Sequence, residues 1–134
     1  MSGFVLHPRL ASDTAFICDW PLSHIVLMND RRFPWFILVP RRAGLIELFD
    51  LDENARAQLI GEIADVSRRL KSWAKADKIN VAALGNQVSQ LHVHVIARII
   101  GDPAWPNPPW NAGKSIPYDN AELQRVTAEL KGIL

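Results

Sequence analysis

The stretch that decides the fold is residues 90–98, Gln-Leu-His-Val-His-Val-Ile-Ala-Arg. Three aliphatic residues alternate here with Gln90, His92 and His94, and a period of two predicts a β-strand. Successive side chains of a strand point to opposite faces, so the amide and the two imidazoles share one face while the aliphatic side chains point into the core. Two of the chain's 4 histidines are therefore expected in one small patch.

Short apolar segments elsewhere in the chain predict four further strands. They are rich in Ile, Val, Phe and Leu and are separated by turn residues. They lie at residues 15–18, 24–29, 35–39 and 79–84. The spacing between the second and the third suits an antiparallel hairpin.

Two helices are predicted from their apolar periodicity and their start signals. The first covers about residues 51–76, where Asp50 and Glu53 form a capping box before apolar residues at three- and four-residue steps. The second begins near Asp119, with Glu122 completing another capping box. The proline-rich segment 101–117 is predicted to hold no regular element. Together these elements predict the α+β class, with an antiparallel sheet of about five strands and helices packed on one side.

Length and composition indicate one globular domain spanning residues 1–134. A formal net charge of +1 argues against duplex nucleic acid as a partner. Cys18 is the only cysteine, so a disulfide framework is excluded and a reducing compartment is expected. The N-terminus lacks a secretory signal, and the strongly apolar run at residues 35–39 is too short to cross a bilayer. We therefore expect a cytoplasmic protein with no membrane partner.

The histidine pair suits the chemistry of phosphoryl or nucleotidyl transfer. An imidazole with a pKa of about 6.5 can act as nucleophile or base near neutral pH. The turn at residues 85–87, Gly-Asn-Gln, lies before the histidine strand and offers backbone N–H groups and side-chain amides to an anion. Imidazoles beside a polar turn thus indicate a candidate site for a phosphorylated ligand.

Two other interpretations of His92 and His94 stay open on spacing alone. They are also compatible with two satisfied surface histidines. His-x-His on a strand is, in addition, a common pair of metal ligands. A closed metal site would need further ligands from His7, His24, Cys18 or a carboxylate, and none of these has diagnostic spacing.

Residues 90–96 resemble the histidine triad motif of the HIT superfamily, His-φ-His-φ-His-φ-φ, with Gln90 in place of the first histidine. Residues 24–29 and 36–42 resemble the nucleotide-side hairpin of that family. The predicted long helix and the strand after it also fall where family members have them. The resemblance covers roughly residues 14–100.

The resemblance implies a hydrolase or transferase for nucleoside phosphates, nucleotidyl phosphoramidates or dinucleoside polyphosphates. In such proteins the middle histidine, here His92, attacks the α-phosphorus to form a nucleotidyl-histidine that water releases. His94 would then hydrogen-bond the phosphate or leaving group. Asn29 matches the ribose-contacting position, and Asn86 and Gln87 match the phosphate-side loop. The resemblance implies a homodimer and requires no metal or other cofactor.

The departure at Gln90 leaves an alternative function open. Glutamine donates and accepts hydrogen bonds but carries no charge, so a non-catalytic nucleotide-binding or regulatory module is the second hypothesis. Asn29 and Asn86 are also ordinary turn residues.

Other residues receive structural expectations. Arg98 is predicted at a solvated strand end, and His7 and His24 are expected to be structural or exposed. Trp105 and Trp110 suggest that segment 101–117 covers the site, packs across a dimer or closes an apolar edge.

Overall fold

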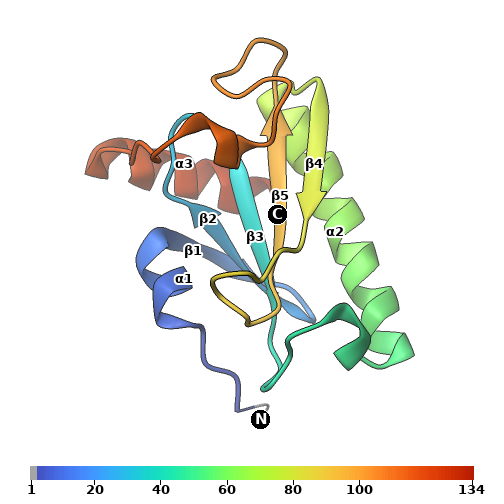
Figure 1. The fold of residues 1–134 in the computed structure, drawn as a ribbon. Coiled ribbons are helices and arrows are strands. Elements are labelled where there is room, and N and C mark those ends of the chain that lie inside the picture. The colour runs from blue at the N-terminus through green and yellow to red at the C-terminus, as the bar shows by residue number, and fades with distance from the viewer. Residues whose placement is uncertain (1–2) are drawn as a thin grey trace.

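Five strands form one antiparallel sheet in the computed structural model, which describes residues 3–134 (Figure 1). Their order in the sheet is β1-β2-β3-β5-β4. The strands are β1 (Thr14–Asp19), β2 (Ser23–Met28), β3 (Trp35–Pro40), β4 (Lys78–Ala82) and β5 (Val93–Arg98). The predicted α+β class and the antiparallel sheet are confirmed, and the four flanking strands lie within two residues of their predicted ends.

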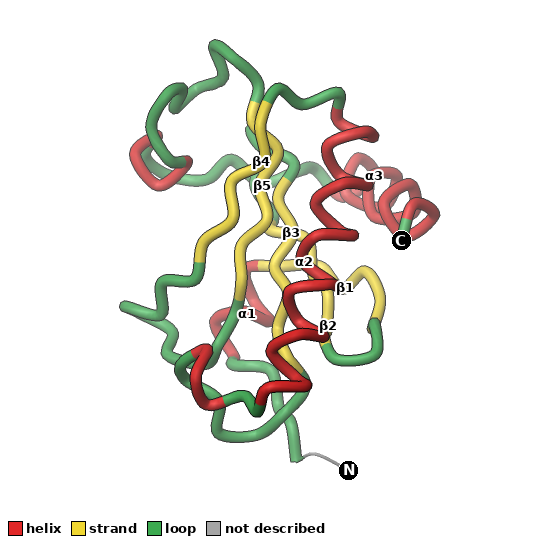
Figure 2. The backbone as a smooth tube through the Cα atoms, turned by 90° about the vertical axis from the view of Figure 1, so that its right-hand side faces the viewer, coloured by secondary structure: helices red, strands yellow, loops and turns green. Residues whose placement is uncertain are grey.

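Two long helices cover one face of this sheet (Figure 2). They are α2 (Glu53–Ala74) and α3 (Asn120–Ile133). Buried Val66 and Leu70 of α2 and Val126 and Leu130 of α3 pack against strand residues such as Phe36. Alternate strand residues meet the helices because strand side chains point to opposite faces.

The opposite face of the sheet is covered by short elements and loops. They include α1 (Pro8–Asp13) and a 3-10 helix at Pro109–Ala112, with a second 3-10 helix at Leu48–Asp50 preceding α2. A second apolar cluster there joins Leu10, Trp35, Ile37 and Ile96. We did not expect α1 from the sequence, because six residues are too few to show a helical period. The prediction that segment 101–117 holds no regular element is wrong at Pro109–Ala112, where proline occupies the first turn and no N–H is needed.

The N-cap of α2 lies two residues beyond the predicted one. Asp52 is the N-cap, and its carboxylate accepts from the backbone N–H of Ala55 at 2.8 Å. Asp50 instead accepts from the backbone N–H groups of Ile46 and Glu47, within the preceding 3-10 turn. Two nearby aspartates offer the same signal, and the local turn decides which one caps the helix. The cap predicted at Asp119 is confirmed by its bond to the N–H of Glu122.

The histidine strand is shorter than predicted, because β5 begins at Val93. The pairing of β5 with β3 ends at Leu38 and Val93, and its pairing with β4 ends at Ala82 and His94, so residues 90–92 are paired with neither strand. His92 therefore lies just before the strand, while the alternation of faces is retained.

Arg98 is buried, with 1% of its surface exposed, so its predicted solvation is wrong. Its guanidinium binds both carboxylate oxygens of Asp102 at 2.7 Å and the Oδ1 atom of Asn80 at 2.9 Å. The ring of Phe33 lies beneath the same guanidinium. The carboxylate of Asp102, which makes this burial possible, comes from the loop after the strand. The sequence does not show that this loop folds back onto Arg98. The Arg98 hydrogen bond in turn lowers the pKa of Asp102.

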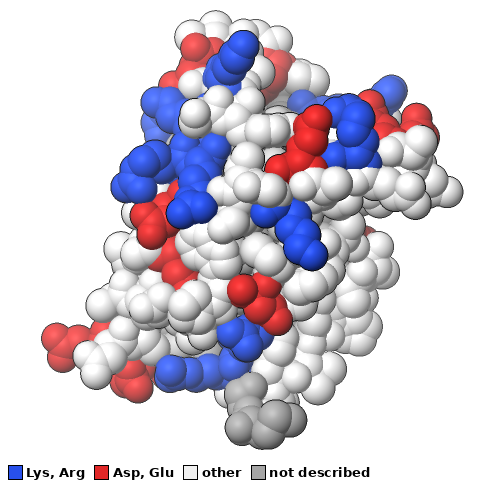
Figure 3. Space-filling model, turned by 180° about the vertical axis from the view of Figure 1, so that it is seen from behind, with Lys and Arg blue, Asp and Glu red and all other residues white. Residues whose placement is uncertain are grey.

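Charged side chains of both signs occupy the helix-covered face (Figure 3). Blue and red side chains are interspersed on this face, with no large area of one sign (Figure 3). Within residues 3–134, every helix is too short or too polar to cross a bilayer.

Candidate functional site

His92 and His94 lie together in a cleft of about 650 Å³ on the sheet face opposite α2. Their ring centroids are 5.0 Å apart, with the rings edge to face. Only 7% of His92 and 5% of His94 is exposed, so both imidazoles are held by packing. The sequence predicted that the pair shares one face, and the structure places it there at the cleft.

The orientation of His92 is set by the main chain. Its Nδ1 atom lies 2.6 Å from the backbone carbonyl oxygen of Gln90. A carbonyl only accepts, so Nδ1 carries the hydrogen and donates it. In the neutral ring the other nitrogen, Nε2, then has a free lone pair, which is the form that a nucleophile requires.

His94 is held from the neighbouring strand β3. Its Nδ1 atom lies 3.0 Å from Nε1 of Trp35, which is 4% exposed. Burial, together with the nearby His92, lowers the pKa of His94 to about 3. His94 is therefore a neutral imidazole at physiological pH.

A second tryptophan forms a wall of the cleft. Trp110, from the 3-10 helix at Pro109–Ala112, has its ring edge to face with His94 at 4.9 Å and with Trp35 at 5.5 Å. Trp110 is 42% exposed, so one side of its ring is open to solvent. Segment 101–117 thus contributes to the cleft in this chain.

Gln90 points away from the two imidazoles. Its Oε1 accepts from the backbone N–H of His7, and its Nε2 donates to the carbonyl of Val5, both at 2.9 Å. The side chain holds the segment before α1, and it is not among the residues lining the cleft. The alternation of the sequence predicted that Gln90 lies beside the two imidazoles and gave no sign of this tether, because the N-terminal segment is 83 residues away along the chain.

The three predicted nucleotide-contacting residues line the same cleft. Oδ1 of Asn29 accepts from the backbone N–H of Tyr118 at 2.9 Å. The Nδ2 group of Asn29 has no hydrogen-bond partner among residues 3–134. Asn86 and Gln87 are exposed on the loop between β4 and β5. Asn29, Asn86 and Gln87 therefore face His92 and His94 across one cleft with amide donors available.

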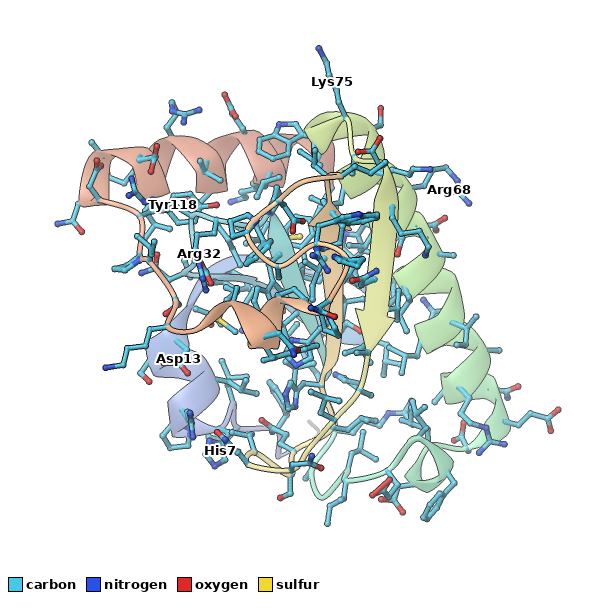
Figure 4. The ribbon with its side chains drawn as sticks, turned by 45° about the horizontal axis from the view of Figure 1, so that its top comes forward. His7, Asp13, Arg32, Arg68, Lys75 and Tyr118 are labelled. Atoms are coloured by element: carbon cyan, nitrogen blue, oxygen red, sulfur yellow. The ribbon has the colours of Figure 1, made fainter. Side chains whose placement is uncertain are left out.

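Charged residues that the sequence did not single out complete the lining. Arg32 lies between α1 and the segment before α3 (Figure 4), where it binds both carboxylate oxygens of Asp30 and the carbonyl of Ala112. Arg9 and Asp13, both on α1, also line the cleft. The hydrogen bond with Asp30 raises the pKa of Arg32.

The register of β3 and β5 was the signal that could have identified Trp35. Ile37 lies opposite His94, and directly opposed residues of an antiparallel pair share a face. Trp35 is two residues from Ile37, so it lies on that face, diagonal to His94. The sequence predicted both strands but not their pairing. No comparable signal was available for Trp110, which an irregular segment carries to the cleft.

The two other histidines lie outside this cleft. His7 accepts from the backbone N–H of Arg9 at the start of α1. His24 stacks on Phe16 and lies 2.7 Å from a carboxylate oxygen of Asp19. Both have the structural roles expected of them. Among residues 3–134, no three His, Cys, Asp or Glu side chains are grouped as a metal site would require.

Comparison with known proteins identifies the family. The model of the HIT domain family matches residues 9–99. A histidine triad protein from Bradyrhizobium japonicum is 49% identical, with a TM-score of 0.92 and an alignment covering 96% of each chain. One from Sinorhizobium meliloti is 46% identical, with a TM-score of 0.95 over 100% of this chain and 99% of the other. One from Marinobacter aquaeolei is 43% identical, with a TM-score of 0.95 over 98% and 96%. Curated proteins yield no match. This chain belongs to the histidine triad (HIT) family.

Proposed function

We propose that this HIT protein is a nucleotide hydrolase or nucleotidyl transferase in which His92 is the nucleophile. Its substrates are nucleoside phosphates, nucleotidyl phosphoramidates or dinucleoside polyphosphates. One observation carries the proposal: Nδ1 of His92 is engaged by the carbonyl of Gln90, so the free Nε2 is available at the cleft. A tightly packed imidazole that is held by the main chain is well suited to covalent catalysis.

The reaction proceeds in two steps: transfer of the nucleotidyl group to His92 and its release to water. The lone pair on Nε2 of His92 forms a bond to the α-phosphorus, and the bond from phosphorus to the leaving oxygen or nitrogen breaks. The leaving group departs with its electron pair and takes a proton from solvent water. Water then attacks the phosphorus, the P–N bond to His92 breaks, and a nucleoside monophosphate is released. In a transferase, another acceptor replaces water.

The remaining residues bind and stabilise charge. His94, neutral because burial lowers its pKa to about 3, hydrogen-bonds a phosphate oxygen or the leaving atom. Asn29 contacts the ribose, and Asn86 and Gln87 contact the phosphates with their amides. Gln90 serves the site through its backbone carbonyl, while its side chain holds the N-terminal segment.

We further propose a cytoplasmic homodimer that uses no metal or other cofactor. Apolar side chains on edge strand β4 and on α2 support self-association, since Val81 is 50% and Ile60 62% exposed. Light scattering coupled to size exclusion tests the dimer, and a monomer at working concentration contradicts it. Activity unaffected by a chelator is expected; loss with the chelator and recovery with zinc would support metal-dependent hydrolysis instead.

The covalent intermediate provides the direct test. Intact-protein mass spectrometry after brief mixing with an adenylated substrate, quenched without acid, should detect an added nucleotide on the unaltered protein. His92→Ala should show neither the adduct nor turnover. His24→Ala is the matched control, because it removes a strand-borne imidazole outside the cleft.

Gln90 motivates the alternative of a non-catalytic nucleotide-binding module, since the first triad imidazole is missing. Nucleotide binding by calorimetry with neither adduct nor turnover would favour that alternative. Turnover that persists in His92→Ala would refute the mechanism.

A further inference from the structure

The hydrogen bond between Trp35 and His94 has a fixed direction. The indole Nε1 of tryptophan always carries its hydrogen and can only donate. Nδ1 of His94 lies 3.0 Å away, within the range of a hydrogen bond, so Nδ1 must accept. A neutral imidazole whose Nδ1 accepts has its single ring hydrogen on Nε2.

We propose that Trp35 is a positioning residue that fixes His94 as the tautomer protonated on Nε2. The neighbouring His92 is fixed in the opposite tautomer, because its Nδ1 donates to the carbonyl of Gln90 at 2.6 Å. The two imidazoles therefore differ at Nε2: His92 has a lone pair and His94 has an N–H. The catalytic consequence rests on the proposed function, whereas the tautomers themselves do not.

The packing around Trp35 keeps this bond in place. The indole is 4% exposed and begins β3, which pairs with β5 along the register that sets Ile37 opposite His94. The rings of Phe33 and Trp110 contact the indole edge to face, with centroids at 6.4 and 5.5 Å. A hydrogen bond shielded from water in this way is stronger, and its loss costs more, than an exposed one.

The electrostatic surroundings keep His94 in the neutral form that the bond requires. A protonated imidazole carries hydrogen on both nitrogens. The N–H at Nδ1 of His94 would then face the indole N–H of Trp35, and neither group could accept a hydrogen bond. Burial and the adjacent His92 disfavour that form. The other charged groups lining the cleft are two pairs of opposite sign, Arg9 with Asp13 and Arg32 with Asp30.

The opposite tautomers give the two imidazoles different roles at the phosphorus. The lone pair of His92 attacks, while the N–H of His94 donates a hydrogen bond to an oxygen that gains negative charge or to the leaving atom. His94 keeps its hydrogen throughout as a fixed dipole. If His94 adopted the other tautomer, its Nε2 lone pair would face the same negative charge and repel it.

Long-range ¹H–¹⁵N NMR of the imidazole nitrogens distinguishes a protonated from a bare nitrogen without any substrate. In the unaltered protein we expect His94 protonated on Nε2 and His92 on Nδ1. Trp35→Phe keeps an aromatic ring but removes the donor, and it should shift the tautomer ratio of His94 about tenfold towards the Nδ1–H form. Trp110→Phe is the matched control, because it trims a ring that contacts the same imidazole without a hydrogen bond.

Each outcome is decisive. Protonation of His94 on Nδ1 in the unaltered protein overturns the proposal, as does an unchanged ratio in Trp35→Phe or an equal shift in Trp110→Phe. If Trp35→Phe does not fold, a through-bond ¹⁵N–¹⁵N correlation between Trp35 and His94 in the unaltered protein supports the proposal, and its absence from resolved signals refutes it.

With an adenylated substrate, Trp35→Phe should lower kcat about tenfold with little change in KM. Correct tautomers with neither a His92 adduct nor turnover would refute the proposed function alone.

Discussion

The burial of His94 predicts that this protein loses stability well above the pH at which carboxylates titrate. The pKa of His94 is lowered from 6.5 to about 3 in the folded protein, first by burial and then by His92. Between these two values the unfolded chain binds a proton that the folded protein does not, so unfolding becomes easier as the pH falls. Above pH 6.5 neither state is protonated at this residue, and the effect vanishes.

The size of the effect follows from the same two pKa values. Each pH unit below 6.5 lowers the free energy of unfolding by about 1.4 kcal/mol, so His94 makes the protein about 2 kcal/mol less stable at pH 5 than at pH 7. Urea unfolding followed by circular dichroism at both pH values measures this difference. His94→Asn, which does not titrate, should lose about 2 kcal/mol less than the unaltered protein over the same interval.

His92→Asn separates the two causes of the lowered pKa. It removes the neighbouring imidazole but leaves His94 buried, so most of the dependence on pH should persist. The reasoning is refuted if the unaltered protein and His94→Asn lose equal stability between pH 7 and pH 5. That result would place the proton uptake elsewhere in the chain.

Three further predictions concern the scaffold around the cleft. Arg98→Met leaves the nearly buried carboxylate of Asp102 unpaired and should lower the free energy of unfolding in urea by about 3–5 kcal/mol. Arg68→Met is the control: it removes an exposed ion pair and should lower the same free energy by less than about 1 kcal/mol. Asp52→Ala removes the cap of α2 and should lower the thermal midpoint by the equivalent of about 1 kcal/mol. Gln90→Ala should increase amide hydrogen exchange at His7 roughly tenfold, because that N–H loses its acceptor; unchanged exchange would contradict the tether.

The parts of the fold that were predictable are those with a strong local period. The alternation around His94 and the three- and four-residue steps of α2 each extend over enough residues to identify the element. Boundaries were less certain where two residues compete for one role, as Asp50 and Asp52 do before α2. The short helix α1 has too few residues to display a period.

The candidate site was predictable only where its residues follow one another in the chain. His92 and His94 are close in sequence, so their shared face follows from the geometry of a strand. Trp35 depends on how β3 pairs with β5, and Trp110 depends on an irregular loop. The burial of Arg98 likewise depends on a long-range partner, since Asn80 completes its contacts from β4.

The bond that orients His92 ends on the main chain of residue 90, and every amino acid carries the same carbonyl there. The side chain at this position therefore does not set the direction in which Nε2 of His92 points. In this chain the glutamine side chain instead binds the backbone of the N-terminal segment that leads into α1. A substitution at position 90 can thus change how the N-terminal segment is held while the orientation of the His92 ring is preserved.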